Sequence, residues 1–242
     1  MQVAVISDIH SNLQALEAVL ADIERHGPDE IWCLGDVVGY GAHPDECTAL
    51  VQKETALCLA GNHDLVVVGQ IDIDYFALDA GDAARWTAET ISEETRRYLD
   101  GLQPVERNHD VGLYHASPRD PIWEYVLSIG QAAECIELQE ERICMIGHSH
   151  VACCFWREDS HVDGGTVRDS TVLQMHAGKW LVNPGSVGQP RDGDPRASYA
   201  VLDLESWTAS YHRVGYEIEE AAAAIFDAGL PRALGERLYS GI

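Results

Sequence analysis

The chain has 242 residues, of which 46% are hydrophobic and 23% are charged, and its 40 acidic and 16 basic side chains give a formal net charge of −24. This length and composition are typical of a globular protein, and we expect a single domain spanning residues 1–242. Because so negative a protein repels polyanions, stable binding to nucleic acid is not expected. The sequence contains no membrane-spanning apolar run and no signal peptide at its start, so we expect a cytoplasmic protein without membrane contact.

The seven cysteines are odd in number and form no C-x-x-C pair, which argues against a disulfide framework or a zinc ribbon. We interpret them as small buried hydrophobic residues.

The first part of the chain alternates strand and helix patterns. Three short apolar runs predict strands, at Val3–Ser7, Ile31–Leu34 and Ala56–Ala60. Asn12 is placed to cap a helix that ends at Gly27-Pro28, and Pro44 can start a second helix. This order, with short connections, predicts parallel strands.

The middle of the chain predicts mixed elements. A helical pattern runs from Ala80 to Leu102, with an irregularity near Thr87–Ser92. Two apolar stretches flank a turn and predict a hairpin, Val105–His109 with Val111–His115. A helix at Ile129–Glu141 and a strand at Ile143–Ile146 follow.

From Val151 onward, short apolar segments separated by turn residues predict successive antiparallel strands. The segments are Ala152–Trp156, Thr171–His176, Trp180–Asn183, Ser198–Leu204 and Thr208–Val214. We interpret Asp163-Gly164-Gly165 as a turn, and a helix at Glu219–Ala228 closes the chain. The two parts together predict a parallel-leaning sheet with helices, packed on a more antiparallel sheet.

Side chains that can bind metal ions follow five of the apolar runs, in the groups Asp8-x-His10, Gly35-Asp36, Gly61-Asn62-His63-Asp64, His115 and His148-x-His150. In open α/β sheets, ligands bind outside the carboxyl ends of the strands, which parallel strands bring to one edge. In extended chain, the i,i+2 spacing of each Asp/His or His/His pair points both of its side chains in one direction. We therefore expect these side chains to face one pocket.

The mixture of side chains suits a pair of first-row divalent ions. Imidazole favours Zn, Fe, Ni or Cu, whereas carboxylate and amide oxygens favour Mn or Mg. Two ions bridged by one carboxylate are the arrangement used for in-line displacement at phosphorus. Each group alone has an ordinary interpretation, such as a turn or a hydrogen-bonded histidine. Their order at successive strand ends predicts a two-metal phosphoesterase.

The order D-x-H, G-D, G-N-H-D, H and G-H-x-H resembles the calcineurin-like metallophosphoesterase superfamily, and Asn183-Pro184-Gly185-Ser186-Val187 resembles a loop of its bacterial and archaeal phosphodiesterase branch. The resemblance implies an α/β fold, a four-layer αββα sandwich of two mixed β-sheets flanked by helices. It implies one ion held by Asp8, His10, Asp36 and His150, and a second held by Asp36, Asn62, His115 and His148, with Asp36 bridging. The expected ions are Mn²⁺ or Fe, Zn or Ni.

The resemblance also implies a metal-dependent phosphoesterase, first of all a phosphodiesterase, that hydrolyses a small phosphate ester, with nucleotides among the candidates. Two ions would lower the pKa of a water so that it attacks as hydroxide. His63 would be the catalytic residue that assists the leaving group. The alternatives are a dinucleoside polyphosphate hydrolase, a phosphoprotein phosphatase, or a non-enzymatic metal-binding interaction scaffold, which the complete set of ligands disfavours.

The sequence departs from the pattern of phosphoprotein phosphatases, G-D-x-x-D-R-G, directly after Asp36. Gly39 replaces the aspartate that orients the catalytic histidine there, and Tyr40 replaces the arginine that clamps phosphate. These changes disfavour a protein phosphatase and leave the group that orients His63 unassigned, with Asp64 as a candidate.

Other residues near the motifs are less specific. A substrate-binding arginine must come from elsewhere in the chain; Arg191 is our candidate, with a solvated turn arginine as the equal alternative. The block H-G of the family is here His115-Ala116. Six further histidines are interpreted as structural, and only His43 lies near the expected crevice. Three aromatic residues could stack on a nucleobase, but their spacing favours core packing; they are Trp86, Trp123 and Tyr125.

Overall fold

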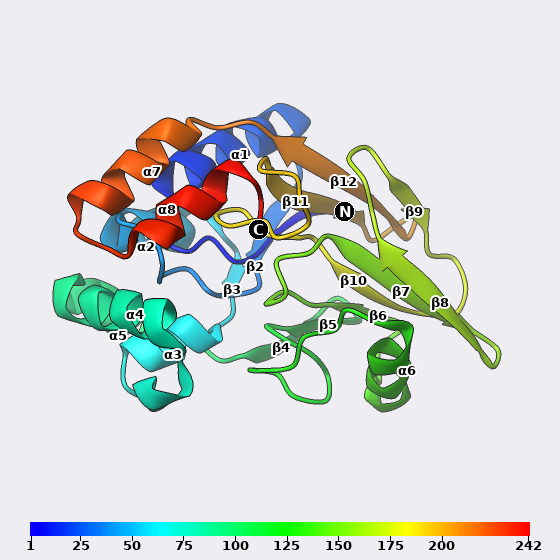
Figure 1. The fold of residues 1–242 in the computed structure, drawn as a ribbon. Helices are drawn as coiled ribbons and strands as arrows, with labels where there is room; N and C mark the ends of the chain where they lie inside the picture. The colour runs from blue at the N-terminus through cyan, green and yellow to red at the C-terminus, as the bar shows by residue number, and fades with distance from the viewer.

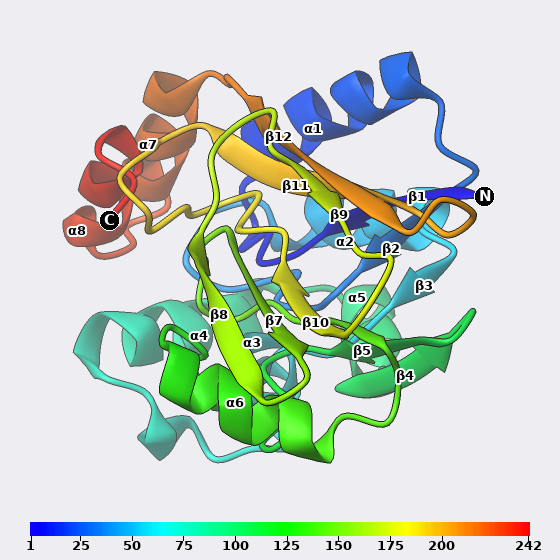
Figure 2. The same ribbon diagram turned by 90° about the vertical axis from the view of Figure 1, so that its right-hand side faces the viewer.

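The computed structural model describes residues 1–242 and consists of two six-stranded sheets with helices on their outer faces (Figure 1). The strand orders are β3-β2-β1-β11-β12-β9 and β4-β5-β6-β10-β7-β8. Figure 2 shows the layers in succession, from α1 through the two sheets to α6. This is the αββα sandwich of two mixed sheets that the sequence resemblance implied.

The first sheet begins with the predicted parallel strands. β1 (Gln2–Ile6), β2 (Glu30–Cys33) and β3 (Leu57–Cys58) are parallel and are connected by α1 (Leu13–His26) and α2 (Pro44–Glu54). As predicted, the Asn12 side chain caps α1 by accepting from the Ala15 N–H, and Gly27 ends it in the left-handed conformation. The sheet continues with three antiparallel strands, β11 (Ala197–Asp203), β12 (Thr208–Val214) and β9 (Val172–Gln174).

The second sheet starts with the predicted hairpin of β4 (Val105–Asn108) and β5 (Val111–Tyr114). β6 (Ile143–Met145) is parallel to β5 and to β10 (Lys179–Asn183). β7 (Cys153–Glu158) and β8 (His161–Thr166) complete it as antiparallel strands. The late strands are thus shared between both sheets, and the expected division into a parallel-leaning and a more antiparallel sheet is wrong.

The interpretation of Asp163-Gly164-Gly165 as a turn is also wrong, because these residues belong to β8. At Gly164 a Cβ atom would lie 2.3 Å from the Cys154 carbonyl oxygen of the neighbouring strand. The glycine therefore allows a close approach of two strands, a use that the sequence does not distinguish from a turn.

The remaining helices are α3 (Asn62–Val67), η1 (Ile73–Tyr75), α4 (Leu78–Thr90), α5 (Glu93–Asp100), α6 (Ile129–Leu138), α7 (Ile218–Asp227), α8 (Arg232–Glu236) and η2 (Arg237–Tyr239). The expected helix from Ala80 to Leu102 is two helices, because Ile91 is extended and the Ser92 side chain caps α5 by accepting from the Thr95 N–H. The helix expected at Glu219–Ala228 does not close the chain, since α8 and η2 follow and pack with it against α4.

Alternating residues of the strands fill two faces of each sheet. On β1, Val3 and Val5 pack between the sheets with residues such as Ile143, whereas Ala4 and Ile6 pack under α1 and α2. A third cluster fills the space between the second sheet and α6. This alternation fixes the register of β1, because a shift of one residue would exchange its two faces.

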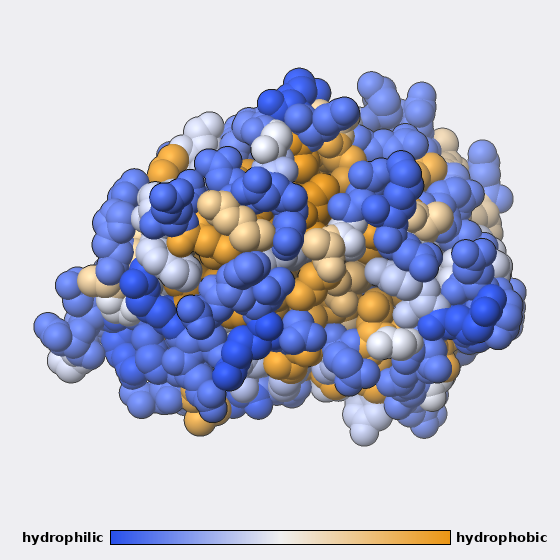
Figure 3. Space-filling model, turned by 180° about the vertical axis from the view of Figure 1, so that it is seen from behind, coloured by the Kyte–Doolittle hydropathy of each residue, from blue (hydrophilic) through white to orange (hydrophobic).

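The outer surface is largely polar, with smaller apolar areas that reach it near the middle of the face shown in Figure 3. All seven cysteines are free, and six of them are buried, which agrees with their interpretation as small hydrophobic residues. None of the helices has the length and apolar character needed to span a bilayer.

Candidate active site

The side chains that follow the strands are brought together where the strand ends of the two sheets meet. Asp8 and Asp36 come from the carboxyl ends of β1 and β2, Asn62 begins α3 after β3, and His115 and His148 follow β5 and β6. With His10 and His150 they make a group of seven side chains, each at most 4% exposed. The predicted convergence at the strand ends is therefore found.

Four of these side chains form a first cluster, in which the possible ligand atoms of Asp8, His10, Asp36 and His150 lie within 4.8 Å of one another. The Nε2 atoms of His10 and His150 are 3.0 Å apart. His10 Nε2 lies 3.5 Å from Asp36 Oδ2, and His150 Nε2 lies 3.5 Å from Asp8 Oδ1.

The hydrogen bonds of His10 and His150 indicate that a cation would fit between their Nε2 atoms. Nδ1 of His10 faces the Val38 carbonyl oxygen at 3.2 Å and Nδ1 of His150 faces that of Gln189 at 2.6 Å, so both Nδ1 atoms must carry protons in order to donate. Burial lowers the pKa of both rings well below the usual value, so they are neutral and their Nε2 atoms carry lone pairs. Two lone pairs that face each other at 3.0 Å repel, and a cation between these groups removes the repulsion.

A second cluster shares Asp36 with the first and adds His115 and His148. Asp36 Oδ2 is 3.5 Å from His115 Nε2, the same distance as from His10 Nε2, so one carboxylate oxygen faces both clusters. His115 donates from Nδ1 to the Leu34 carbonyl at 2.9 Å, and its Nε2 lies 3.1 Å from Asn62 Oδ1. His148 donates from Nε2 to the Trp123 carbonyl, which leaves Nδ1 as its free nitrogen. Ala116 in place of the family's glycine does not displace His115.

Burial sets the charge state of these groups in the absence of an ion. It raises the pKa of the Asp8 and Asp36 carboxyl groups, and the neighbouring carboxylate of Asp64 raises that of Asp36 further. It lowers the pKa of His148 to about 4. Crowded carboxylates and neutral imidazoles together lack positive charge, and bound divalent cations would supply it. The residues present therefore fit a two-ion centre.

The backbone of five of these residues is unusual. Their φ angles are positive, at 54° for Asp8, 50° for His10, 53° for Asp36, 62° for His148 and 59° for His150. Residues other than glycine rarely adopt this left-handed conformation, which clusters at functional sites. The expected extended i,i+2 geometry is wrong: the chain turns tightly at both pairs. Each pair nevertheless faces one pocket, while Ile9 packs into the core.

The sequence did not indicate that Asn183, at the end of β10, and Ser186, in the loop after it, brace both tight turns. Asn183 Nδ2 donates to the Gly147 carbonyl at 2.8 Å and to Ser149 Oγ at 3.0 Å. Ser186 Oγ donates to the Asp8 carbonyl at 2.7 Å. The only signal for this role was the resemblance of residues 183–187 to a family loop.

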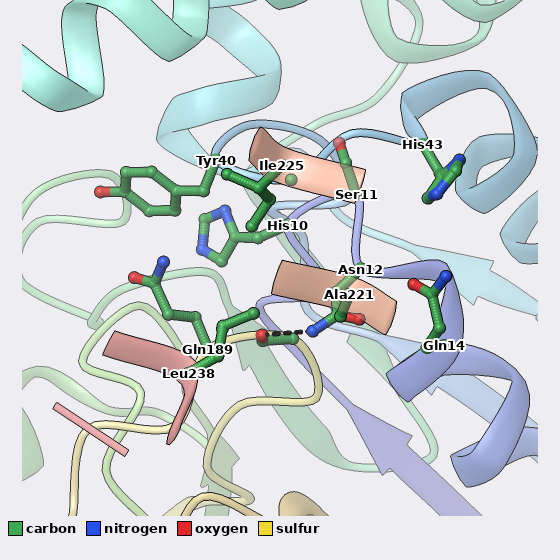
Figure 4. Close-up of a pocket in the computed structure, with 12 residues that line it drawn as sticks. His10, Ser11, Asn12, Gln14, Tyr40, His43, Gln189, Ala221, Ile225 and Leu238 are labelled. Atoms are coloured by element: carbon green, nitrogen blue, oxygen red, sulfur yellow. Dashed lines mark hydrogen bonds between the residues drawn. The ribbon is translucent and has the colours of Figure 1, made fainter. Parts of the chain in front are cut away.

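A small cavity lies on the other side of His10 (Figure 4). The ring of His10 lies beside Tyr40 there, with 4.6 Å between ring centroids, and near Gln189. The dashed line marks the hydrogen bond from Asn12 Nδ2 to the Gly188 carbonyl, 2.8 Å long, which ties the loop to the start of α1. His43 lines this cavity and belongs to neither cluster.

The ring of His63 lies 4.8 Å from that of His10, and 4.4 Å from each of the rings of Tyr40 and Phe76, by ring centroids. Neither ring nitrogen has a hydrogen-bond partner in the protein, and burial lowers the pKa of the ring well below its usual value. A Cβ atom on Gly39 would lie 2.5 Å from Nδ1, so the ring rests directly on this glycine.

Asp64 does not orient His63, and that expectation is wrong. Its carboxylate accepts hydrogen bonds from the backbone N–H groups of Gly61 at 2.9 Å, Val38 at 3.1 Å and Val37 at 3.3 Å. Asp64 therefore holds together the loops after β2 and β3, which carry Asp36 and His63.

A cavity of about 270 Å³ opens over His63 and the second cluster. Its outer lining is aromatic, and includes Tyr40, Tyr75, Phe76, Trp123 and Tyr125. The interpretation of Trp123 and Tyr125 as core residues is thus wrong, whereas Trp86 does pack against a buried cluster, that of α7 and α8.

Arg191 also lines this cavity, so its alternative interpretation as a solvated turn residue is wrong. Its guanidinium lies over the Tyr40 ring, 5.7 Å from the centroid, and donates to Gln189 Oε1 at 2.8 Å. It makes no salt bridge with a carboxylate, so its charge is available to an anion in the cavity.

Comparisons with known proteins agree with this geometry. The calcineurin-like phosphoesterase superfamily domain matches residues 1–207. An uncharacterized protein of Methanocaldococcus jannaschii is 39% identical over 99% of this chain and 98% of its own. The crystal structure of a metallophosphoesterase from Sphaerobacter thermophilus has 40% identity and a TM-score of 0.91 over 100% of this chain and 99% of its own. A symmetrical bis(5′-nucleosyl)-tetraphosphatase of Actinobacillus pleuropneumoniae is 30% identical over 36% of this chain and 37% of its own.

The fold, the two clusters that share Asp36 and the match over residues 1–207 lead to one conclusion. The chain belongs to the calcineurin-like phosphoesterase superfamily, and it is a metallophosphoesterase, a hydrolase that acts on phosphoric ester bonds.

Proposed function

We propose that this protein is a phosphodiesterase that hydrolyses a small phosphate ester at a two-ion centre. The observation that supports this most is the shared carboxylate oxygen of Asp36, 3.5 Å from a histidine of each cluster. Asp8, His10 and His150 would complete the first ion site, and Asn62, His115 and His148 the second. Divalent ions bound there would supply Lewis-acid charge and lower the pKa of a water molecule to near neutrality.

The residues around the centre would handle the substrate. Arg191, which has no carboxylate partner, would pair with a non-bridging phosphate oxygen. His63 is neutral and buried, so one of its nitrogens carries a proton, and no protein group competes for it. That N–H would donate to the departing ester oxygen, a role that typically contributes about 10²–10⁴-fold in rate.

A protein phosphatase fits the pocket less well than a diesterase. Gly39 and Tyr40 stand where such enzymes have an aspartate and an arginine, and the cavity of about 270 Å³ is narrow and ring-lined. Hydrolysis of dinucleoside polyphosphates is the second candidate, supported by the similarity of about a third of the chain to a bis(5′-nucleosyl)-tetraphosphatase.

The proposal is tested by removing all metal and reloading the protein with Mn²⁺, Fe²⁺, Ni²⁺, Zn²⁺ or Mg²⁺. We expect two ions per chain, and faster hydrolysis of bis-p-nitrophenyl phosphate than of p-nitrophenyl phosphate. Hydrolysis of diadenosine tetraphosphate is measured in parallel, because it tests the second candidate function. His63→Ala should keep both ions and lose about 10²–10⁴-fold in kcat, whereas His43→Ala, outside both clusters, should change neither. Absence of turnover with every ion would overturn the proposal.

A further inference from the structure

Four aromatic side chains form one wall of the cavity, which we call the aromatic wall: Tyr75 and Phe76 from η1 and its end, and Trp123 and Tyr125 from the segment after β5. Trp123 stacks on Tyr75, with centroids 5.7 Å apart and an angle of 29°, and meets Phe76 edge-on at 5.9 Å. Trp123 thus joins two sequence segments that are almost 50 residues apart, whereas Tyr125 stacks on the ring of His148, with centroids 4.3 Å apart.

Three of the four wall residues lie outside the hydrophobic core, whereas Phe76 packs against one of its buried clusters. Tyr75, Trp123 and Tyr125 belong to none of the buried clusters, and Tyr75 is 73% and Tyr125 42% exposed. Contiguous aromatic surface left open to water at the mouth of a pocket is typical of a ligand-binding site, where a bound apolar group would cover it.

The wall begins at His63. The ring of His63 lies 4.4 Å from Phe76, Phe76 lies next to Trp123, and Trp123 lies next to Tyr75 at the rim. His63 is the group proposed to face the departing oxygen, so whatever is attached to that oxygen extends along the wall. The wall is therefore on the leaving-group side of the phosphate.

The side chains that line the cavity limit the chemical class of ligand that it can bind. Apart from Asp36 and Arg191, which face the phosphate position, the cavity contains no acidic side chain and no lysine or further arginine, so it offers nothing to a charged head group. A volume of about 270 Å³ admits one phosphate with one flat ring and not a folded polypeptide. Aromatic side chains take up bases by stacking without reading their edges.

We propose that the aromatic wall binds a flat aromatic ring carried by the leaving alcohol of the substrate, the ring chemistry of a nucleobase. This inference rests on the proposed diesterase function and names its substrate class. Trp123 is the central residue, because it contacts the rings of both Tyr75 and Phe76.

The test uses three methyl diesters that share one phosphate and differ in the second alcohol: adenosine 5′-(methyl phosphate), ribose 5-(methyl phosphate) and phenyl methyl phosphate. Each competes with bis-p-nitrophenyl phosphate on the metal-loaded protein, and its inhibition constant is measured. We expect the adenosyl diester to bind about five- to a hundredfold more tightly than the ribosyl diester. Trp123→Ala should abolish this ratio, and Trp123→Phe should restore most of it.

Trp156→Ala is the matched control, since Trp156 stacks on Trp180 on β7 and β10 and does not line the cavity. Equal binding of the adenosyl and ribosyl diesters by the wild-type protein, or a ratio that survives in Trp123→Ala, would overturn the inference. If phenyl methyl phosphate binds as tightly as the adenosyl diester, the site for a flat ring is supported, and simple aryl esters rather than nucleotides are its substrates. If the protein hydrolyses no diester, the proposed function fails, and calorimetric titration of the same three compounds still decides whether the wall binds a ring.

Discussion

Substitution of Gly39 by alanine tests how this protein holds its candidate catalytic histidine without the aspartate used by related phosphatases. Gly39 has a φ of +95°, and an added Cβ would lie 2.5 Å from His63 Nδ1 and 3.0 Å from its Cγ. Ordinary contacts of a Cβ atom begin at 3.4 Å, so the ring must move by about 0.9 Å, the difference between 3.4 Å and 2.5 Å. Tyr40 and Phe76 lie on either side of the ring and restrict where it can go.

Two effects should follow from Gly39→Ala, and they differ in size. An alanine in the left-handed region costs about 1–2 kcal/mol of stability, which lowers the unfolding temperature by a few degrees. Displacement of a catalytic group by about 1 Å costs on the order of 10²-fold in turnover. We therefore expect kcat to fall about a hundredfold, while both ions stay bound.

The assay combines kcat for bis-p-nitrophenyl phosphate, metal content per chain and the thermal unfolding midpoint. Gly229→Ala is the matched control, because Gly229 also has a positive φ, +74°, but nothing lies within 4 Å of its added Cβ. The control should lose a similar amount of stability and no activity. A Gly39→Ala protein with both ions bound and kcat within about twofold of the wild type would refute the idea that this glycine positions His63.

Three further substitutions separate the roles of neighbouring groups. Arg191→Ala should raise KM for the diester at least about tenfold, because a charge-assisted contact with phosphate is lost. Arg168→Ala, at an exposed arginine, is the control and should leave KM unchanged. Equal KM values for the wild type and Arg191→Ala would show that Arg191 does not bind the substrate. Asp64→Asn replaces an acceptor of three backbone N–H groups and should cost about 1–3 kcal/mol in urea unfolding, and an unchanged midpoint would contradict that. Asn183→Ala removes two hydrogen bonds that hold the turn of His148 and His150. Titration with metal ions should therefore show about 10- to 100-fold weaker metal binding. A variant that binds metal as tightly as the wild type would exclude a bracing role for Asn183.

The convergence of the candidate ligand side chains could be predicted from the sequence, because short apolar runs mark the strand ends and the family resemblance groups the residues that follow them. Parallel pairing brings Asp8 and Asp36 together at the ends of β1 and β2 in one sheet. It brings His115 and His148 together at the ends of β5 and β6 in the other sheet. The two ends of α1, at Asn12 and Gly27, could also be predicted, because helix caps depend on neighbouring residues alone.

What could not be predicted depends on contacts between distant segments. The turns at Asp8/His10 and at His148/His150 place non-glycine residues in the left-handed region, and hydrogen bonds from Asn183 and Ser186, far along the chain, help to hold them. Gly164 lies in a strand although the sequence indicated a turn, and Gly39 lies under the ring of His63, a contact that the sequence does not indicate. The aromatic wall joins residues from two loops, and no periodicity marks residues that line a loop-built surface.

The bracing loop has a consequence for the order in which the protein is made. Ser186 bonds to Asp8 and Asn12 bonds to Gly188 across 178 and 176 residues of chain, and His10 meets His150 across 140. Contacts of such sequence separation form late, because the ordering of the intervening chain must precede them. A nascent chain that has emerged only to residue 182 carries all seven candidate ligands but no brace. The candidate site can therefore be completed only after the loop has emerged, and we expect it to form late in synthesis.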